Sequence, residues 1–198
     1  HMHSFAKCDG LKRILIPGSI NVIGRYAFQE CSSLEEVIIS SSTSLIENHA
    51  FTKCKNLKNI SIPQSVINIH PYAFEECSSL EKIVIPHSLT ELTSFSFSQC
   101  SSLKEIVIPS SVTSIRSHCF FNCTSLENIK IPDSVTRIGK FAFQSCSSLI
   151  QISIPETVQK IGSNAFIGCS SLQKITISSY PFIKHLGIDS KTEIDLID

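Results

Sequence analysis

Cysteine is the residue type in this chain best suited to chemistry, because thiols form disulfides, bind metals and act as nucleophiles. The chain has 198 residues and 9 cysteines. Eight of them recur at one constant interval, at Cys8, Cys31, Cys54, Cys77, Cys100, Cys123, Cys146 and Cys169. A regular set of this kind indicates a disulfide framework, a zinc site or a structural column.

Three observations favour the structural column. Equivalent side chains of stacked repeats have parallel Cα–Cβ bonds, whereas a disulfide needs two bonds that point toward each other. The chain has no Cys-x-x-Cys pair and no Cys/His cluster that could surround zinc tetrahedrally. The cysteines also lie in an apolar pattern, where a free thiol behaves as a small buried hydrophobe. We therefore predict a structural thiol ladder, with no metal and no cofactor.

Two other groups are candidate nucleophiles. Cys119 lies outside the ladder, in a column otherwise filled by Ala or Ser. We interpret it as a tolerated small side chain, with a reactive thiol as the alternative. Serine pairs such as Ser78-Ser79 also recur, but a serine nucleophile needs a positioned base, and no His or Lys recurs with them. We predict no catalytic residues and a protein that is not an enzyme.

Apolar residues recur at the same interval as the cysteines, so most of the chain is a repeat. Phenylalanines recur from Phe5 to Phe166, and leucines follow them with the same 23-residue period. In each repeat, Leu-x-x-Ile-x-Ile-Pro predicts a short strand with one buried face, ended by a proline that cannot donate to a sheet. A second apolar pair, such as Val112 and Ile115, predicts a short strand or a turn. The spacing of Phe-x-x-Cys-x-x-Leu predicts a helical or 3₁₀ turn.

A 23-residue unit cannot bury its own apolar face, so the copies are expected to stack into a solenoid. Over residues 4–180, the motif Phe-x-x-Cys-x-x-Leu-x-x-Ile-x-Ile-Pro resembles the leucine-rich repeat of the BspA-like subfamily. The resemblance implies a mainly β repeat solenoid, a horseshoe of about eight coils with a parallel concave β-sheet and short turns or 3₁₀ segments on the convex side. The chain departs from the family at the usual Asn after the strand, where Ser or Thr stands, as at Ser88 and Thr157.

The resemblance also implies a function, because members of this family are often surface proteins that bind other proteins. We expect a non-enzymatic protein-binding module, a fragment of a surface or adhesion protein that holds a protein ligand on its concave sheet. The alternative is an intracellular scaffold or regulatory subunit, so the location stays open between the cell surface and the interior. The expected contacts are the outward-facing strand residues Glu36, Ile38, Asn59, Ser61, Lys82, Val84, Glu105, Val107, Asn128, Lys130, Gln151 and Ser153.

Two further columns predict how the coils stack. The residue after each Leu alternates in charge, which predicts a ladder of opposite charges. Its members are Lys12, Glu35, Lys58, Glu81, Lys104 and Glu127. The other column is aromatic or His, which predicts stacked rings along the convex edge. Its members are Tyr26, His49, Tyr72, Phe95, His118 and Phe141.

Composition and the chain ends complete the prediction. Lys and Arg number 17, as do Asp and Glu, and this zero net charge argues against nucleic acid binding. Apolar runs are only a few residues long, so membrane insertion is not expected. Residues 1–3 resemble a cloning remnant, and residues 181–198 fit no column and are expected to form a non-repeat C-terminal tail or cap. The first coil lacks a polar cap, which predicts self-association through it.

Overall fold

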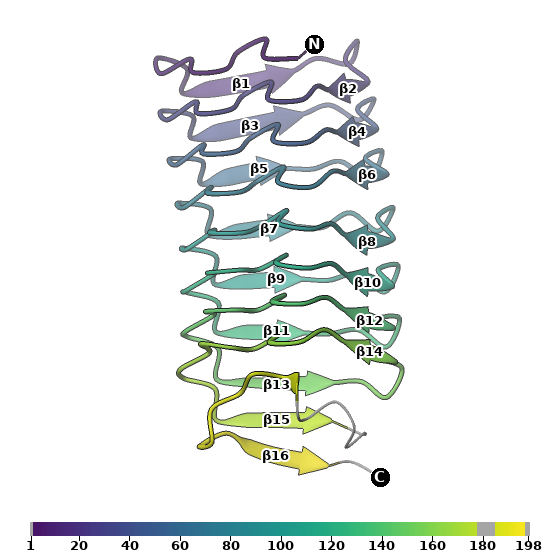
Figure 1. Ribbon diagram of the computed structural model, residues 1–198. Coiled ribbons are helices and arrows are strands. Elements are labelled where there is room, and N and C mark those ends of the chain that lie inside the picture. The colour runs from purple at the N-terminus through teal and green to yellow at the C-terminus, as the bar shows by residue number, and fades with distance from the viewer. Residues whose placement is uncertain (1, 178–184, 197–198) are drawn as a thin grey trace.

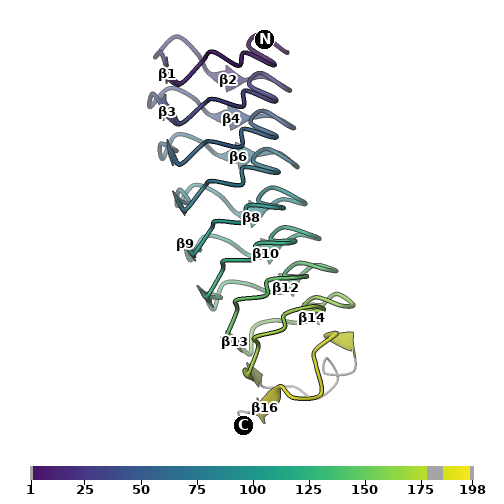
Figure 2. The same ribbon diagram turned by 90° about the vertical axis from the view of Figure 1, so that its left-hand side faces the viewer.

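The chain winds into a stack of coils built from longer and shorter strands. The computed structural model describes residues 2–177 and 185–196. Figure 1 shows the coils one above another, and Figures 1 and 2 together place the longer strands on one face and the turns on the opposite face. The longer strands are β1 (Arg13–Ile16), β3 (Glu36–Ile39), β5 (Asn59–Ser61), β7 (Lys82–Val84), β9 (Glu105–Val107), β11 (Asn128–Lys130), β13 (Gln151–Ile154), β15 (Lys174–Ile177) and β16 (Glu193–Leu196).

The second apolar pair of each repeat forms a two-residue strand, which decides between the two alternatives left open by the sequence. These strands are β2 (Val22–Ile23), β4 (Leu45–Ile46), β6 (Asn68–Ile69), β8 (Glu91–Leu92), β10 (Ser114–Ile115), β12 (Arg137–Ile138) and β14 (Lys160–Ile161). The longer strands pair in the orders β1-β3-β5, β11-β9-β7 and β13-β15-β16, and the shorter ones in the orders β2-β4-β6 and β14-β12-β10-β8. All these pairings are parallel. The prediction of a mainly β solenoid of about eight coils is confirmed.

A constant register places equivalent residues of consecutive repeats directly over one another. In the pairing of β7 with β9, Ile83 lies opposite Ile106, its equivalent in the next repeat, and both side chains are buried. The phenylalanines Phe5 to Phe166 form a column of stacked rings with centroids 5.2–5.7 Å apart. Burying one such side chain contributes about 1.5–3 kcal/mol. The core is therefore a set of continuous columns shared by all coils.

The segment between a shorter strand and the next longer strand consists of short turns, one of the two alternatives of the predicted solenoid, and not of a helical or 3₁₀ turn. It is a series of turns, each closed by a hydrogen bond between residues three apart. The Cys31 N–H, for example, donates to the Phe28 carbonyl at 3.2 Å. Two residues per repeat have left-handed φ values, as Tyr26 at 56° and Glu30 at 58°. Their N–H groups donate hydrogen bonds to the next coil. The N–H of Glu30, for example, donates to the Thr52 carbonyl at 2.8 Å. Successive three-residue turns and a 3₁₀ turn share one apolar spacing, so the pattern could not separate them.

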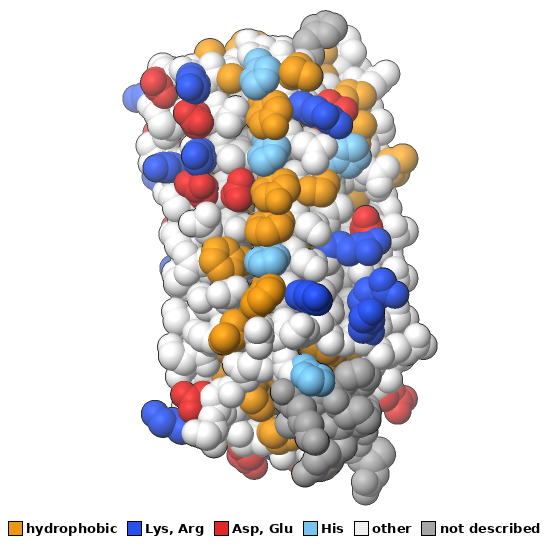
Figure 3. Space-filling view, in the orientation of Figure 1, with side chains coloured by type: hydrophobic (Ala, Val, Ile, Leu, Met, Phe, Trp, Pro, Cys, Tyr) orange, Lys and Arg blue, Asp and Glu red, His pale blue; other side chains and the backbone are white. Residues whose placement is uncertain are grey.

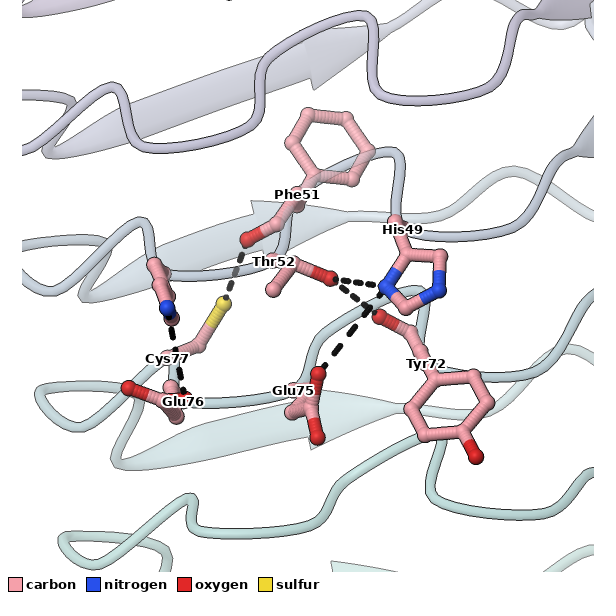
Figure 4. Close-up of polar contacts among 8 residues, drawn as sticks. His49, Phe51, Thr52, Tyr72, Glu75, Glu76 and Cys77 are labelled. Atoms are coloured by element: carbon pink, nitrogen blue, oxygen red, sulfur yellow. Dashed lines mark hydrogen bonds and ion pairs between the residues drawn. The ribbon is translucent and has the colours of Figure 1, made fainter. Parts of the chain in front are cut away.

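The cysteines of the ladder are free thiols, and all of them except Cys8 are buried. From Cys31 to Cys169, each Sγ lies 2.9–3.2 Å from the carbonyl oxygen of a Phe in the preceding coil. In Figure 4, Cys77 Sγ donates to the Phe51 carbonyl, which also accepts the Cys54 N–H. Each thiol thus both fills the core and bonds to the preceding coil.

Residues 185–196 lie against the last full repeat. Strand β16 pairs with β15 so that Lys174 lies opposite Glu193, and this coil is shorter than the repeats before it. Leu186 is fully buried, and its carbonyl accepts the Phe166 N–H at 2.9 Å. Within the predicted tail 181–198, residues 181–184 and 197–198 lie outside the described residues, as does residue 1 of the predicted cloning remnant. The division into remnant, solenoid and tail stays a prediction.

Candidate binding surface

The outward-facing residues of the longer strands form one exposed surface, which we call the sheet face. Alternation along each strand turns the middle residue inward and its two neighbours outward, as the exposed–buried–exposed pattern of β7 shows. Figure 3 shows the face of the molecule that carries the turns, so the sheet face lies on the far side of that view. The fold brings all twelve predicted contact residues to this face, six on β3, β5 and β7 and six on β9, β11 and β13.

A half-apolar row runs across the sheet face, in the order Leu15, Ile38, Ser61, Val84, Val107, Lys130 and Ser153. Val84 is 70% exposed, Val107 is 66% exposed and Ile38 is 47% exposed. Leu15 continues the row on β1 and is 64% exposed. Side chains of this size usually lose most of their exposure on folding, so an aligned set of them on a regular sheet is unusual for a surface without a partner.

The sheet face is hollowed in two places. The first hollow has a volume of about 240 Å³, and its polar lining includes Glu36 and Lys82. The second has a volume of about 1020 Å³, and its charged lining residues are Glu105, Lys130, Asp133 and Glu156. Three carboxylates against one ammonium make the second hollow acidic, whereas the first has one charge of each sign.

Sequence reasoning missed four polar residues that line the larger hollow. They are Ser110, Asp133, Glu156 and Thr176. A signal existed for the first three, because each follows the proline that ends a longer strand and all three occupy one column of the repeat. The prediction considered only residues within the strands and therefore left out this rim.

The predicted ladder of opposite charges is wrong in its location. The described residues Lys12, Glu35 and Lys58 stack through backbone bonds, yet no ion pair within 4.0 Å joins the charged side chains of this column. Two of the ion pairs form instead in a turn column with left-handed φ values. Its pairs are Lys7 with Glu30 at 3.8 Å and Lys53 with Glu76 at 4.0 Å. Both columns alternate in sign, but the spacing of residues does not tell which side chains point toward each other.

The predicted stack of surface rings is confirmed. From His3 to Phe141, consecutive ring centroids are 4.4–4.9 Å apart. Figure 3 shows a column of hydrophobic and His side chains along the middle of the face that carries the turns. The rings cover one another's faces, so only their edges are available to a partner.

A small polar network lies beside this stack (Figure 4). The Thr52 hydroxyl donates to the Tyr72 carbonyl at 2.7 Å, so it accepts from His49 Nδ1–H at 3.2 Å. Glu75 Oε2 lies 3.9 Å from the same ring nitrogen. Burial lowers the pKa of His49 and raises the pKa of Glu75, and both shifts favour the neutral forms. The network holds two coils together, and its Thr52 hydroxyl is buried and directs its proton to the Tyr72 carbonyl and not to the imidazole.

The structure also places the other candidate reactive groups. Cys119 is fully buried, and burial raises the pKa of its thiol to about 12, with the Ser96 hydroxyl 3.4 Å away. The described residues contain no group of three or more His, Cys, Asp or Glu side chains that could hold a metal ion. No helix among the described residues has the length and apolar character needed to cross a membrane.

The repeat, the parallel coils and the exposed sheet define a leucine-rich-repeat protein. The chain belongs to the BspA-type leucine-rich-repeat family, whose model, described as "BspA type Leucine rich repeat region (6 copies)", matches residues 1–126 and 67–187. The family resemblance inferred from the motif is therefore confirmed. A comparison with curated proteins finds no match to this chain.

Solved structures support the same conclusion. A leucine-rich-repeat protein of T. pallidum is 31% identical, with a TM-score of 0.78, over 94% of this chain and 87% of that one. A leucine-rich-repeat protein of Bacteroides ovatus is 27% identical, with a TM-score of 0.61, over 100% and 63%. A leucine-rich cell surface protein of Faecalibacterium prausnitzii is 26% identical, with a TM-score of 0.58, over 98% and 62%. The chain thus spans less than two thirds of the length of the last two proteins.

Proposed function

We propose that the chain is a non-enzymatic protein-binding module that holds a protein ligand on its sheet face. The observation that carries this proposal is the apolar row of Ile38, Val84 and Val107, which is 47–70% exposed on a regular sheet. Protein interfaces combine an apolar centre with a polar rim. The sheet face has this composition, because charged and amide side chains such as Glu105 and Asn128 flank the row.

The experiment compares capture of proteins by wild type and by two double variants. Val84→Asp/Val107→Asp places charges in the apolar row and is expected to abolish capture. Ile67→Asp/Ile150→Asp is the matched control, since both isoleucines are exposed, at 55% and 43%, and neither lies in the row. A ligand that both double variants bind as well as wild type does would refute the proposal.

We also propose a location at the cell surface, where this module would act in adhesion. The family resemblance supports this location, as does the F. prausnitzii relative described as a cell surface protein. Labelling of intact cells by an antibody against this chain tests the location. Labelling only after permeabilisation would favour the intracellular scaffold in its place.

Self-association through the first coil is a separate proposal. Phe5 is 43% exposed, whereas the other phenylalanines of its column are 0–2% exposed. Among residues 2–177 and 185–196, strand β1 pairs only with β3, and an edge strand can pair with another chain. Light scattering at high protein concentration tests this proposal, and a monomer at every concentration would remove it.

A further inference from the structure

Three cations without an ion-pair partner lie on consecutive coils, on the side of the shorter strands. They are Arg137, Lys140 and Lys160, which we call the basic patch, and all three are exposed. None of the ion pairs among the described residues includes them. Figure 3 shows Lys and Arg side chains gathered on the side where Figure 1 draws the shorter strands. The patch is separate from the sheet face.

The basic patch places two like charges on neighbouring coils. Arg137 on β12 lies directly opposite Lys160 on β14, which places two like charges side by side. Some other coils pair opposite charges, as Arg13 with Glu36 at 3.5 Å and Lys174 with Asp195 at 3.0 Å, whereas Asp133 and Glu156 place two carboxylates at equivalent positions of neighbouring coils. Like charges opposite each other destabilise a sheet. A bound anion would remove this cost.

Three further residues, Ser114, Arg116 and Gly162, lie beside the basic patch. Ser114, which precedes Arg137 in the same strand row, has a buried hydroxyl with no hydrogen-bond partner in the described part of the chain. Arg116 borders the patch and is already paired with Glu91, whose Oε2 lies 2.6 Å from Nη2 and 2.8 Å from Nε. At Gly162 a Cβ would lie 2.2 Å from the Lys140 backbone nitrogen, so close packing of these two coils excludes a side chain there.

The surroundings favour an anion on a polar chain over a protein or a nucleic acid. The apolar residues of the two strands, Ile138 and Ile161, are buried, so the patch offers none of the exposed apolar anchors that form the centre of a protein interface. A single-stranded nucleic acid would need several free aromatic faces for its bases, but the neighbouring Phe141 already stacks on His118. Exposed polar residues, among them Thr136 and Gln159, suit a ligand rich in hydroxyl groups.

We propose that the basic patch binds a sulfated polysaccharide. Arg137 and Lys160 contact successive sulfate groups along the chain, because neighbouring coils of a parallel stack are about 4.8 Å apart. Lys140 contacts a sulfate from the adjacent turn. Charge-assisted hydrogen bonds from these groups to the sulfate oxygens provide the affinity, and the ligand removes the repulsion between Arg137 and Lys160.

The test measures binding of fluorescently labelled heparin to the full chain at about 0.1 M salt, where the electrostatic screening length is about 10 Å. The variant Arg137→Gln/Lys140→Gln/Lys160→Gln is expected to bind at least about tenfold more weakly and with a smaller dependence on salt. The matched control is Lys12→Gln/Lys58→Gln/Lys104→Gln, which removes three exposed cations of another column that form no ion pair. The control is expected to bind as wild type does, and circular dichroism checks that both variants are folded.

Competition by other chains tests the class of ligand. Desulfated heparin, poly-glutamate and duplex DNA are each expected to displace labelled heparin at least about tenfold less well than unlabelled heparin does. Equal binding by the two triple variants would overturn the assignment to this patch. Equal competition by poly-glutamate or DNA would overturn the assignment to a sulfated polysaccharide. The single variant Lys160→Gln, with an expected weakening of at least about threefold, provides the same test if the triple variant does not fold.

Discussion

At the scale of single residues, the thiols combine two structural tasks. Each buried Sγ fills a small core position, and its hydrogen bond to a Phe carbonyl gives that acceptor a second donor, as with Cys100 and Phe74 at 3.2 Å. Burial raises the pKa of these thiols, since a thiolate would lose its hydration in the core. The same feature that makes the cysteines useful for packing makes them poor nucleophiles.

The exposure of the thiols predicts their reactivity. In the native protein at neutral pH, only Cys8 is expected to react rapidly with a thiol reagent, because it alone is not buried. In denaturant all 9 cysteines are expected to react. Reagent titration of wild type and of Cys8→Ser measures both numbers. Rapid labelling of Cys119 in native Cys8→Ser would contradict the interpretation of Cys119 as a buried packing residue.

A second prediction at this scale concerns His118. Burial lowers its pKa below the ordinary value of 6.5. Its Nδ1 has no hydrogen-bond partner in the described part of the chain, because Phe121 occupies the position that corresponds to Thr52 beside His49. A histidine with a lower pKa in the folded state binds fewer protons when folded, so stability is full above the unfolded value and decreases as the pH falls through it.

The variant His118→Phe is therefore expected to lose less thermal stability than wild type between about pH 7.5 and pH 5.5. Phenylalanine suits the position, because Phe95 and Phe141 already lie above and below in the ring column. Thermal unfolding at the two pH values is the measurement, with His87→Phe, an exposed site outside the column, as the control. The same pH dependence in His118→Phe and wild type would show that His118 does not titrate with folding.

At the scale of the elements, the turns show what stacking demands of the backbone. A left-handed φ costs an ordinary residue about 1–2 kcal/mol, yet two columns of such residues pass through the coils. The cost is offset by N–H groups that bond to the next coil and by the ring stack or ion pairs of the side chains. The chain places Gly168 in one of these columns, at a φ of 76°, where no such cost arises.

Gln99 provides a test of this backbone strain. Its φ is 61°, so Gln99→Gly is expected to raise the free energy of unfolding by up to about 1 kcal/mol. The β-branched variant Gln99→Val is expected to lower it by about 1 kcal/mol or more, because its side chain crowds the left-handed conformation. Urea denaturation compares the two variants. A lower stability for Gln99→Gly than for Gln99→Val would rule out strain as the dominant cost at this turn.

The like-charged pair of β12 and β14 predicts that a substitution which weakens the proposed anion binding will raise the stability of the free protein. Lys160→Glu replaces the repulsion from Arg137 with attraction and is expected to raise the free energy of unfolding by about 0.2–1 kcal/mol. The gain should shrink in high salt, which screens exposed charges. Chemical denaturation at low and high salt measures both effects, with Lys104→Glu as the matched control. A loss of stability in low salt would mean that the two side chains do not repel.

Particular columns show how far the sequence could predict these elements. The constant period of the repeat predicted the strands, the thiol ladder and the ring stack, because each depends only on which residues lie above one another. The charged column of Lys12 and Glu35 failed, since ion pairing depends on side-chain direction, which the spacing of residues does not contain. The sheet face was predicted as a surface, but its rim at Asp133 and Glu156 comes from loop geometry, which the strand pattern does not describe.

At the scale of the whole molecule, the stability of each coil depends on its contacts with the neighbouring coils. Each coil contacts the coil above and the coil below, so a central coil loses two sets of contacts when its core is damaged and a terminal coil loses one. Phe74 is fully buried between Phe51 and Phe97, whereas Phe5 stacks on Phe28 alone and is 43% exposed.

Phe74→Ala is therefore expected to lower the free energy of unfolding by about 3–5 kcal/mol, because it opens a cavity that rigid neighbouring columns cannot close. Phe5→Ala is expected to cost less than half as much, since its ring is partly hydrated already. Urea denaturation of both variants, with hydrogen exchange to locate the loosened coils, is the measurement. Hydrogen exchange should rise in the coils next to residue 74 in Phe74→Ala. In Phe5→Ala it should rise only in the first coil. Equal costs for the two substitutions, or loosening spread evenly over the stack, would show that the coils act as a single cooperative unit and not as a chain of nearest neighbours.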